Sequence, residues 1–260
     1  QLNGVYYYRR KSYKLEGGVS MGRHGTIAGR KAAQDSKRAA LFTKYAKAIT
    51  VAAKDGGDPE YNAGLRVAIE KAKAISMPND NITRAIKKGT GELEGVSYEE
   101  LSFEGYGAGG VAFIVDCLTD NTNRTTSFVK SSFDKHGGNV GTPGCVSYMF
   151  SRKGVLLIER TDEISEDDIM EAALEAGADD IVSDEESFTV YTDPSVYPDV
   201  HKALTDAGYT FIESDVEFVP SVDSTPSEND IPKLRKLIDV LEDNDDIQKV
   251  HTNCAIDLYE

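Results

Sequence analysis

The periodicity of apolar residues changes near Tyr98, and this change limits the fold more than any other feature of the 260-residue chain. Before Tyr98, apolar residues recur at helical spacing within residues 34–54, 65–75 and 81–88. After Tyr98, short strand-like runs alternate with helical stretches. Separate helical and mixed blocks argue against one doubly wound sheet. The pattern therefore predicts an α+β protein that opens with a three-helix bundle.

The order of elements in the second block predicts two ferredoxin-like-type α+β domains. Within residues 154–219 the order is strand, helix, strand, strand, helix, strand, which is typical of the ferredoxin-like fold. The expected strands are 154–159, 180–183, 187–192 and 209–219, and the expected helices are 165–176 and 194–207. Outside this unit, the sequence indicates strands at 110–118, 146–150 and about 250–257, and helices at 121–136 and 231–241. The last helix and strand can complete the sheet begun near Val111, so the middle domain is expected to be discontinuous.

These patterns divide the chain into four segments. Residues 1–20 are expected to be a disordered extension or tag that precedes a natural start at Met21. Residues 21–95 form the basic helical domain. Residues 96–151 together with 221–260 form the discontinuous α+β domain, and residues 152–220 form the α+β domain inserted into it.

Charge is distributed very unevenly along the chain. The formal net charge is −15, yet residues 22–88 contain 14 Lys and Arg against 6 Asp and Glu. Residues 89–260 contain 11 against 37. An acidic body repels phosphate, so the basic segment predicts a local polyanion-binding module.

The basic residues of the first helical stretch lie mostly on one side of the expected helix. Leu41, Tyr45, Ala48, Ile49 and Ala52 form an apolar stripe, with Phe42 at its edge, and Lys37, Lys44 and Lys47 fall mostly on the opposite side. The alternative is a solvated basic face, and Arg38 lies near the apolar side. For cations in the third helix, the alternative is capping of its C-terminus. The predicted nucleic-acid contacts are Arg23, His24, Arg30, Lys31, Lys37, Arg38, Lys44, Lys47, Arg84, Lys87 and Lys88.

A second polar cluster lies at a strand-to-helix turn and comprises Asn121, Asn123, Arg124 and Thr125. It is either the N-cap of the helix or a phosphate site at the helix N-terminus. Residues 105–110 match G-x-G-x-x-G, but the dinucleotide fingerprint needs a helix after it. A strand follows here, so a glycine-rich turn is expected.

No catalytic, metal or cofactor site is predicted. The four His residues have no ligand spacing, and no nucleophile, base and orienting residue come together in the sequence. The three Cys residues have no pair spacing, which favours a reduced, cytoplasmic protein. No run approaches the roughly 18 apolar residues of a membrane span. An enzyme that uses the cleft between domains stays open as an alternative.

Several motifs give the chain a resemblance to a known family. They are residues 30–38 with 42–44, Met77-Pro78-x-Asp80-x-Ile82, residues 104–107, Thr119-Asp120-Asn121-x-Asn123-Arg124-Thr125, residues 137–139 and Leu241-Glu242-Asp243-x-Asp245-Asp246. From Met21 onward the chain resembles the YebC family, which includes the mitochondrial translational activator of cytochrome c oxidase. The resemblance implies a helical domain and two α+β domains, the middle one discontinuous.

The resemblance also implies function. Members of the family are described as cytoplasmic DNA-binding transcriptional regulators, and others act in translation on ribosomes, including relief of stalling at proline-rich stretches. Many members carry a Trp between His24 and Arg30, whereas residues 25–29 here contain no aromatic residue.

We therefore predict a non-enzymatic, monomeric, nucleic-acid-binding regulator of gene expression. Its partner is DNA, or ribosomal or transfer RNA if the protein is a ribosome-associated translational activator. Phosphate contacts alone do not distinguish these partners.

Overall fold

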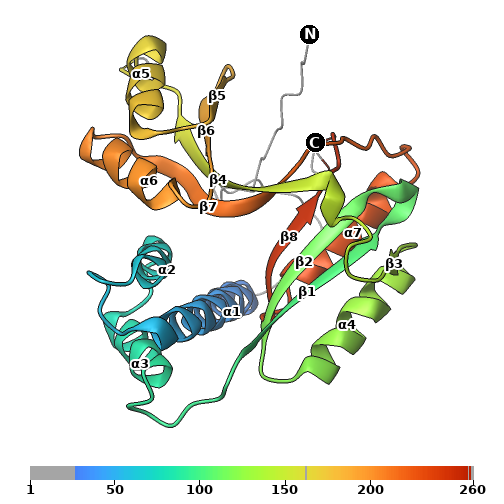
Figure 1. Ribbon diagram of the computed structural model, residues 1–260. Helices are drawn as coiled ribbons and strands as arrows, with labels where there is room; N and C mark the ends of the chain where they lie inside the picture. Colours follow the sequence, from blue (N-terminus) through green and yellow to red (C-terminus); the bar gives the residue numbers. More distant parts are fainter. Residues whose placement is uncertain (1–26, 162, 257, 259–260) are drawn as a thin grey trace.

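The computed structural model describes residues 27–161, 163–256 and 258, with side chains from residue 39 onward. It confirms the predicted α+β class, because a helical part is followed by two antiparallel four-stranded sheets (Figure 1). Each sheet carries two helices on one face. The crossing of the long strands β4 and β7 past the first sheet brings the two sheets together.

Three helices form the N-terminal part: α1 (Ile27–Ala52), α2 (Ala63–Ala74) and α3 (Asn79–Gly89). Ile49, Leu65 and Ile82 contribute one residue from each helix to their shared core. The predicted stripe of α1 is partly wrong, since Ala46 and Ala53, rather than Leu41 and Ala48, join this core. The second helix begins at Ala63 with Asn62 as its N-cap, whose side chain accepts a hydrogen bond from the backbone N–H of Leu65.

The first sheet has the strand order β3-β1-β2-β8. Its strands are β1 (Glu99–Tyr106), β2 (Ala112–Thr119), β3 (Asn139–Val140) and β8 (Ile247–Thr252). Helices α4 (Thr122–Lys135) and α7 (Ile231–Glu242) pack on one face against Phe113 and Val115 of β2. The alternate residues Ala112 and Ile114 face the opposite side. Because β8 comes from the far end of the chain, the domain is discontinuous, as predicted.

The second sheet has the order β5-β6-β4-β7. Its strands are β4 (Phe150–Glu159), β5 (Asp180–Ser183), β6 (Ser187–Thr192) and β7 (Phe211–Pro220). Helices α5 (Glu166–Ala176) and α6 (Tyr197–Asp206) enclose its core. The order of elements is the predicted ferredoxin-like order. The boundary positions near residues 95, 151 and 220 stay predictions, since Phe150 of β4 and Phe218 of β7 also pack against Ile114 of the first sheet.

Two strand predictions are wrong in detail. Residues 146–150 do not form a separate strand, because Ser147–Met149 is a short 3₁₀ turn that leads into one ten-residue strand, β4. Strands β1 and β3 were not predicted. In β1 only Gly105 is fully buried, so the alternation that marks a half-buried strand is weak there.

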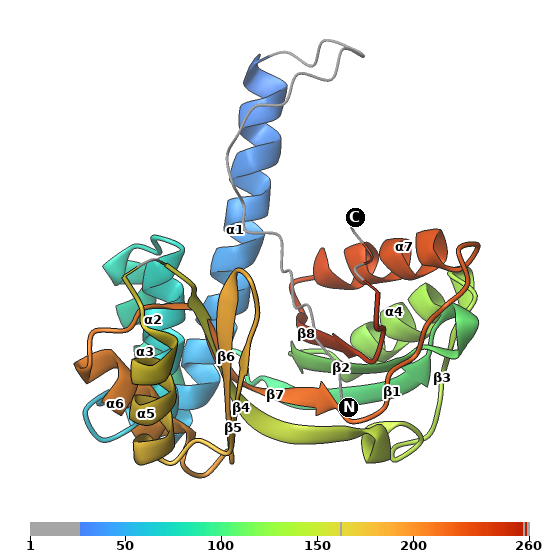
Figure 2. The same ribbon diagram turned by 90° about the horizontal axis from the view of Figure 1, so that it is seen from above.

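Helix α1 connects the parts of the molecule. One of its faces packs on α2 and α3, and its C-terminal half also runs past β8 and β2 (Figure 2). Its N-terminal part projects beyond the rest of the described chain in that view. Helices α1 and α3 approach closely where Gly89 meets Thr50, since a Cβ at Gly89 would lie 2.4 Å from the Thr50 carbonyl oxygen.

Candidate nucleic-acid interface

Helix α3 presents a group of exposed cations. Ile82 and Ala85 are buried against the other two helices, which leaves Arg84, Lys87 and Lys88 exposed. Among the residues whose side chains are described, none of these three cations takes part in an ion pair. The positive charge of this helix is therefore available to a partner from outside.

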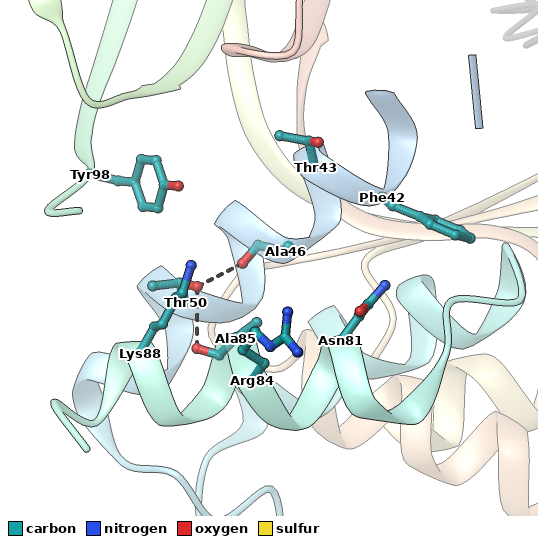
Figure 3. Close-up of a pocket in the computed structure, with 9 residues that line it drawn as sticks. All are labelled: Phe42, Thr43, Ala46, Thr50, Asn81, Arg84, Ala85, Lys88 and Tyr98. Atoms are coloured by element: carbon teal, nitrogen blue, oxygen red, sulfur yellow. Dashed lines mark hydrogen bonds between the residues drawn. The ribbon is translucent and has the colours of Figure 1, made fainter. Parts of the chain in front are cut away.

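A cleft of about 200 Å³ lies between the exposed edges of α1 and α3, beside their packed faces (Figure 3). Asn81, Arg84 and Lys88 of α3 line one side, at the spacing that places residues on one helix face. Phe42, Thr43, Ala46 and Thr50 of α1 line the other side, and the Tyr98 ring stands at the end opposite Phe42. The cleft thus combines two cations with two aromatic rings.

Tyr98 is held in place from two sides. The Lys54 Nζ donates a hydrogen bond to the Tyr98 carbonyl oxygen at 3.1 Å. The Lys47 ammonium lies 5.8 Å from the centroid of the Tyr98 ring, within the range of a cation–π interaction. The first contact restrains the Tyr98 backbone, and the second places a cation beside its ring.

The prediction that Lys47 contacts nucleic acid is wrong. Its side chain is only 7% exposed, and its Nζ lies 2.6 Å from Oδ1 of Asp246. It also donates to the Asp245 carbonyl oxygen at 3.0 Å. Lys47 does lie opposite the helical core, but that opposite face of α1 is covered by the discontinuous domain. Periodicity within one helix cannot reveal such a cover.

Asp246 also forms hydrogen bonds with residues of the second predicted cluster. Arg124 donates to its Oδ2 at 2.6 Å, and the Thr125 hydroxyl lies 3.0 Å from the same oxygen. Burial opposes the charge of Asp246, but hydrogen bonds from Lys47 and Arg124 outweigh that cost and hold the pKa of this carboxyl below its ordinary value. Asp246 is thus an ionised, buried carboxylate that joins α1 to α4.

The structure supports the N-cap reading of the Asn121 cluster. The Asn121 side chain accepts a hydrogen bond from the backbone N–H of Arg124 at 3.0 Å. Arg124 also pairs with Asp120 at 2.7 Å, so two carboxylates already neutralise its guanidinium. Asn123 is exposed and lies outside this network. This geometry favours the N-cap over the phosphate site, because the single cation of the cluster is paired with acids.

The remaining predicted contacts are spread along α1 and before it. Arg23 and His24 lie outside the described residues. Positions 30, 31, 37 and 38 lie on the α1 backbone, and their side chains are outside the described part. Lys44 is half-buried on the same helix. Among the predicted contacts with described side chains, the three α3 cations are placed as the phosphate hypothesis requires.

A second, partly buried ion cluster joins all three parts and was not predicted. Lys71 of α2 lies 2.6 Å from Asp215 of β7, and Lys249 of β8 pairs with Asp215 and with Glu217. Burial alone would raise the pKa of Asp215, but the two lysines lower it to about 2. These contacts join residues that are distant in sequence and lie on a helix and on strands of two different sheets, so they leave no local signal in the sequence.

Other chemistry is limited within the described chain. The structure there contains no group of three His, Cys, Asp or Glu side chains suited to a metal ion. The glycine-rich segment is a turn between β1 and β2, with Gly109 and Gly110 at φ 70° and 76°, as expected. Cys117, Cys145 and Cys254 form no disulfide. None of the described helices combines the length and apolarity that crossing a membrane requires.

Comparison with solved structures identifies the fold. A crystal structure of a conserved hypothetical protein from Aquifex aeolicus superimposes with a TM-score of 0.76 at 44% identity. The match covers 85% of this chain and 91% of that one. At this identity, the likeness extends beyond the fold to the sequence.

Comparison with curated proteins gives the same grouping. A probable transcriptional regulatory protein of Clostridioides difficile (strain 630) is 50% identical, over 91% of this chain and 100% of its own length. One from Clostridium novyi (strain NT) is 52% identical, over 87% and 93%. Residues 23–92 match the family described as "TACO1/YebC protein N-terminal domain", and residues 98–254 match "TACO1/YebC second and third domain". The chain belongs to the TACO1/YebC family.

Proposed function

We propose that this protein is a nucleic-acid-binding regulator of gene expression whose helical domain supplies the phosphate contacts. The observation that carries the proposal is the set of α3 cations, Arg84, Lys87 and Lys88, which are exposed and lack ion-pair partners among the described side chains. Lys47 and Lys71 of the same domain instead form ion pairs within the protein. The names of the relatives, probable transcriptional regulatory proteins, support a role in regulation.

The position of Arg84 in α3 supports a role in binding an anionic ligand. Lys87 and Lys88 lie in the last turn of α3, where the helix dipole favours cations. Arg84 lies before that turn, and its like-charged neighbour Lys88 is four residues away on the same face. Such a pair destabilises an isolated helix by about 0.2–0.5 kcal/mol. A bound anion removes this repulsion.

The body of the protein supports an oriented contact. The segment after residue 88 is strongly acidic, so it repels a phosphate backbone and leaves the helical domain as the approach side. This arrangement favours local binding over coating of the whole protein by nucleic acid.

The salt dependence of binding tests the proposal. In duplex DNA each neutralised phosphate contributes about 0.9 to the slope of log K against log salt. Replacing Arg84, Lys87 and Lys88 together by Gln is therefore expected to reduce that slope by about 2.7 and to weaken binding at low and moderate salt. Fluorescence anisotropy with duplex DNA and with a ribosomal RNA fragment measures both quantities.

A matched control separates a local contact from net charge. Lys130, Lys135 and Lys236 are exposed cations on α4 and α7 of the discontinuous domain. Their replacement by Gln makes the same change in net charge and is expected to leave the slope unchanged. Equal losses in the two triple variants would refute the assignment of the contacts to α3.

The choice between DNA and RNA is a separate proposal. Phosphate contacts do not report the type of nucleic acid, so translational activation on the ribosome stands as the alternative to transcriptional regulation. Cosedimentation with ribosomes, compared with retention on duplex DNA, distinguishes them. Retention on DNA alone excludes the translational role.

A further inference from the structure

We propose that the cleft between α1 and α3 is a binding site for an unpaired nucleotide, with its base against Tyr98 and its phosphate at Arg84 and Lys88. This inference rests on the proposed function and names the form of nucleic acid that the helical domain takes. Single-stranded segments, rather than duplex, are then the preferred ligand.

The size of the cleft limits its occupant. Its volume of about 200 Å³ is below the roughly 300–1,000 Å³ of sites that hold drug-sized molecules. A group the size of one ring fits such a space. The small side chains of Ala46 and Ala85 line it, one from each helix, and leave room between the two walls.

The Thr50 hydroxyl in the wall is already satisfied within the protein. The Thr50 hydroxyl lies 2.8 Å from the Ala46 carbonyl oxygen and 3.2 Å from that of Ala85 (Figure 3). The part of the wall that Ala46, Thr50 and Ala85 form is therefore apolar in its behaviour and suits the face of a ring. Recognition by the face of a base tolerates any sequence, because every base has one.

The charges of the cleft select a phosphate-bearing ligand. Arg84 and Lys88 lie on the α3 side, and Figure 3 shows their charged ends beside the space between Tyr98 and Phe42. The backbone of a single strand carries one phosphate for each base, so one nucleotide supplies both the ring and the anion. Its stacking on an aromatic ring next to basic residues is the usual mode of single-strand binding.

The position of Tyr98 explains why the base must be unpaired. Within a duplex both faces of a base are covered by its neighbours, so a protein ring reaches a base face only after unstacking. Lys54 restrains the Tyr98 backbone and Lys47 lies beside its ring before binding, which lowers the entropy cost of forming the stack.

Binding of three probes to the full chain tests this inference. The probes are an oligothymidylate, an abasic deoxyribose-phosphate oligomer of equal length, and a duplex. The wild-type protein is expected to bind the oligothymidylate at least about fivefold more tightly than the abasic oligomer, the contribution of the weakest single stack. An oligouridylate measured in parallel identifies whether RNA or DNA is the tighter source of the same chemistry.

Two variants test whether Tyr98 causes the preference for oligothymidylate over the abasic oligomer. Tyr98→Leu keeps an apolar side chain and is expected to bind the oligothymidylate no more tightly than the abasic oligomer, with abasic binding unchanged. Tyr61→Leu is the control, since Tyr61 is 88% exposed in the same domain and does not line the cleft. It is expected to keep the wild-type preference.

The outcomes separate this inference from the proposed function. If the wild-type protein binds the abasic oligomer as tightly as the oligothymidylate, the nucleotide site is overturned, while binding of phosphate backbones still stands. That comparison needs no variant, so it holds even if Tyr98→Leu fails to fold. If none of the probes binds at low salt, the proposed function itself fails.

Discussion

Asp246 is the residue on which the contact between the helical and discontinuous domains depends most. Its side chain is 3% exposed and is satisfied by Lys47, Arg124 and Thr125. The acidic segment that contains it looks like a solvated turn in the sequence. The structure shows that one of its carboxylates is buried and takes two cations away from any external ligand.

We predict that Asp246→Asn lowers the free energy of unfolding by about 3 kcal/mol. Removing one member of a buried pair leaves the other charge without compensation, and the buried Lys47 ammonium is that charge here. Urea denaturation measures the loss. Asp245→Asn is the control, because Asp245 is 48% exposed at 3.6 Å from Lys47 and should cost less than about 1 kcal/mol. Similar losses in both variants would contradict a special role for Asp246.

At the scale of elements, the close approach of α1 and α3 depends on a glycine. Gly89 is the last residue of α3, and the Thr50 carbonyl of α1 occupies the place where its side chain would be. The resulting contact of the two backbones sets the width of the cleft beside it.

We predict that Gly89→Ala destabilises the protein by about 1–3 kcal/mol, the range for overpacking a close contact. In an exposed helix the same change would stabilise by about 1 kcal/mol. Gly64→Ala in α2 is the comparison, since its Cβ would meet only the Asn62 side chain at an ordinary 3.6 Å. Thermal unfolding measures both variants, and a stabilised Gly89→Ala would show that the helices do not approach as described.

Most elements could be predicted from the sequence because their signals are local. Ser165 caps α5, Asn121 caps α4, and the limits of β5 and β6 follow from short apolar runs between turns. Strand β1 was missed because its burial is completed by β2, β3 and α4, which lie elsewhere in the sequence.

The candidate site was predictable only in part, for a related reason. The cations of α3 are exposed on a helix whose buried side is obvious in the sequence. Lys47 and Arg124 both form ion pairs with Asp246, which is far away in the chain, so neither pair could be predicted from local sequence. The contribution of Tyr98 to the cleft arises from the path of the linker, which no periodicity describes.

At the scale of the whole molecule, one buried and one partly buried ionic cluster join its three parts. The Asp246 cluster links α1 to the discontinuous domain, and the Asp215 cluster links α2, β7 and β8. Both carboxylates have pKa values below their ordinary range. The stability of the assembled molecule should therefore depend on acid pH.

We predict that Asp215 contributes about 2 kcal/mol of stability that is lost on acidification. Its folded pKa of about 2 lies below the ordinary 3.8, so the contribution is fully present above about pH 4 and disappears as the pH falls through 2. The difference in unfolding free energy between wild type and Asp215→Asn, measured from pH 2 to 6, isolates this residue. A difference that does not change with pH would contradict the prediction.

The strand order of the first sheet also has a consequence for biosynthesis. β2 is buried along almost its whole length, yet its partner β8 is the last strand of the described chain. While the nascent polypeptide grows, one edge of this very apolar strand stays uncovered until Ile247–Thr252 has emerged. Uncovered edges invite aggregation, so chaperone protection during this interval, or premature termination before β8, will decide how much of the protein survives.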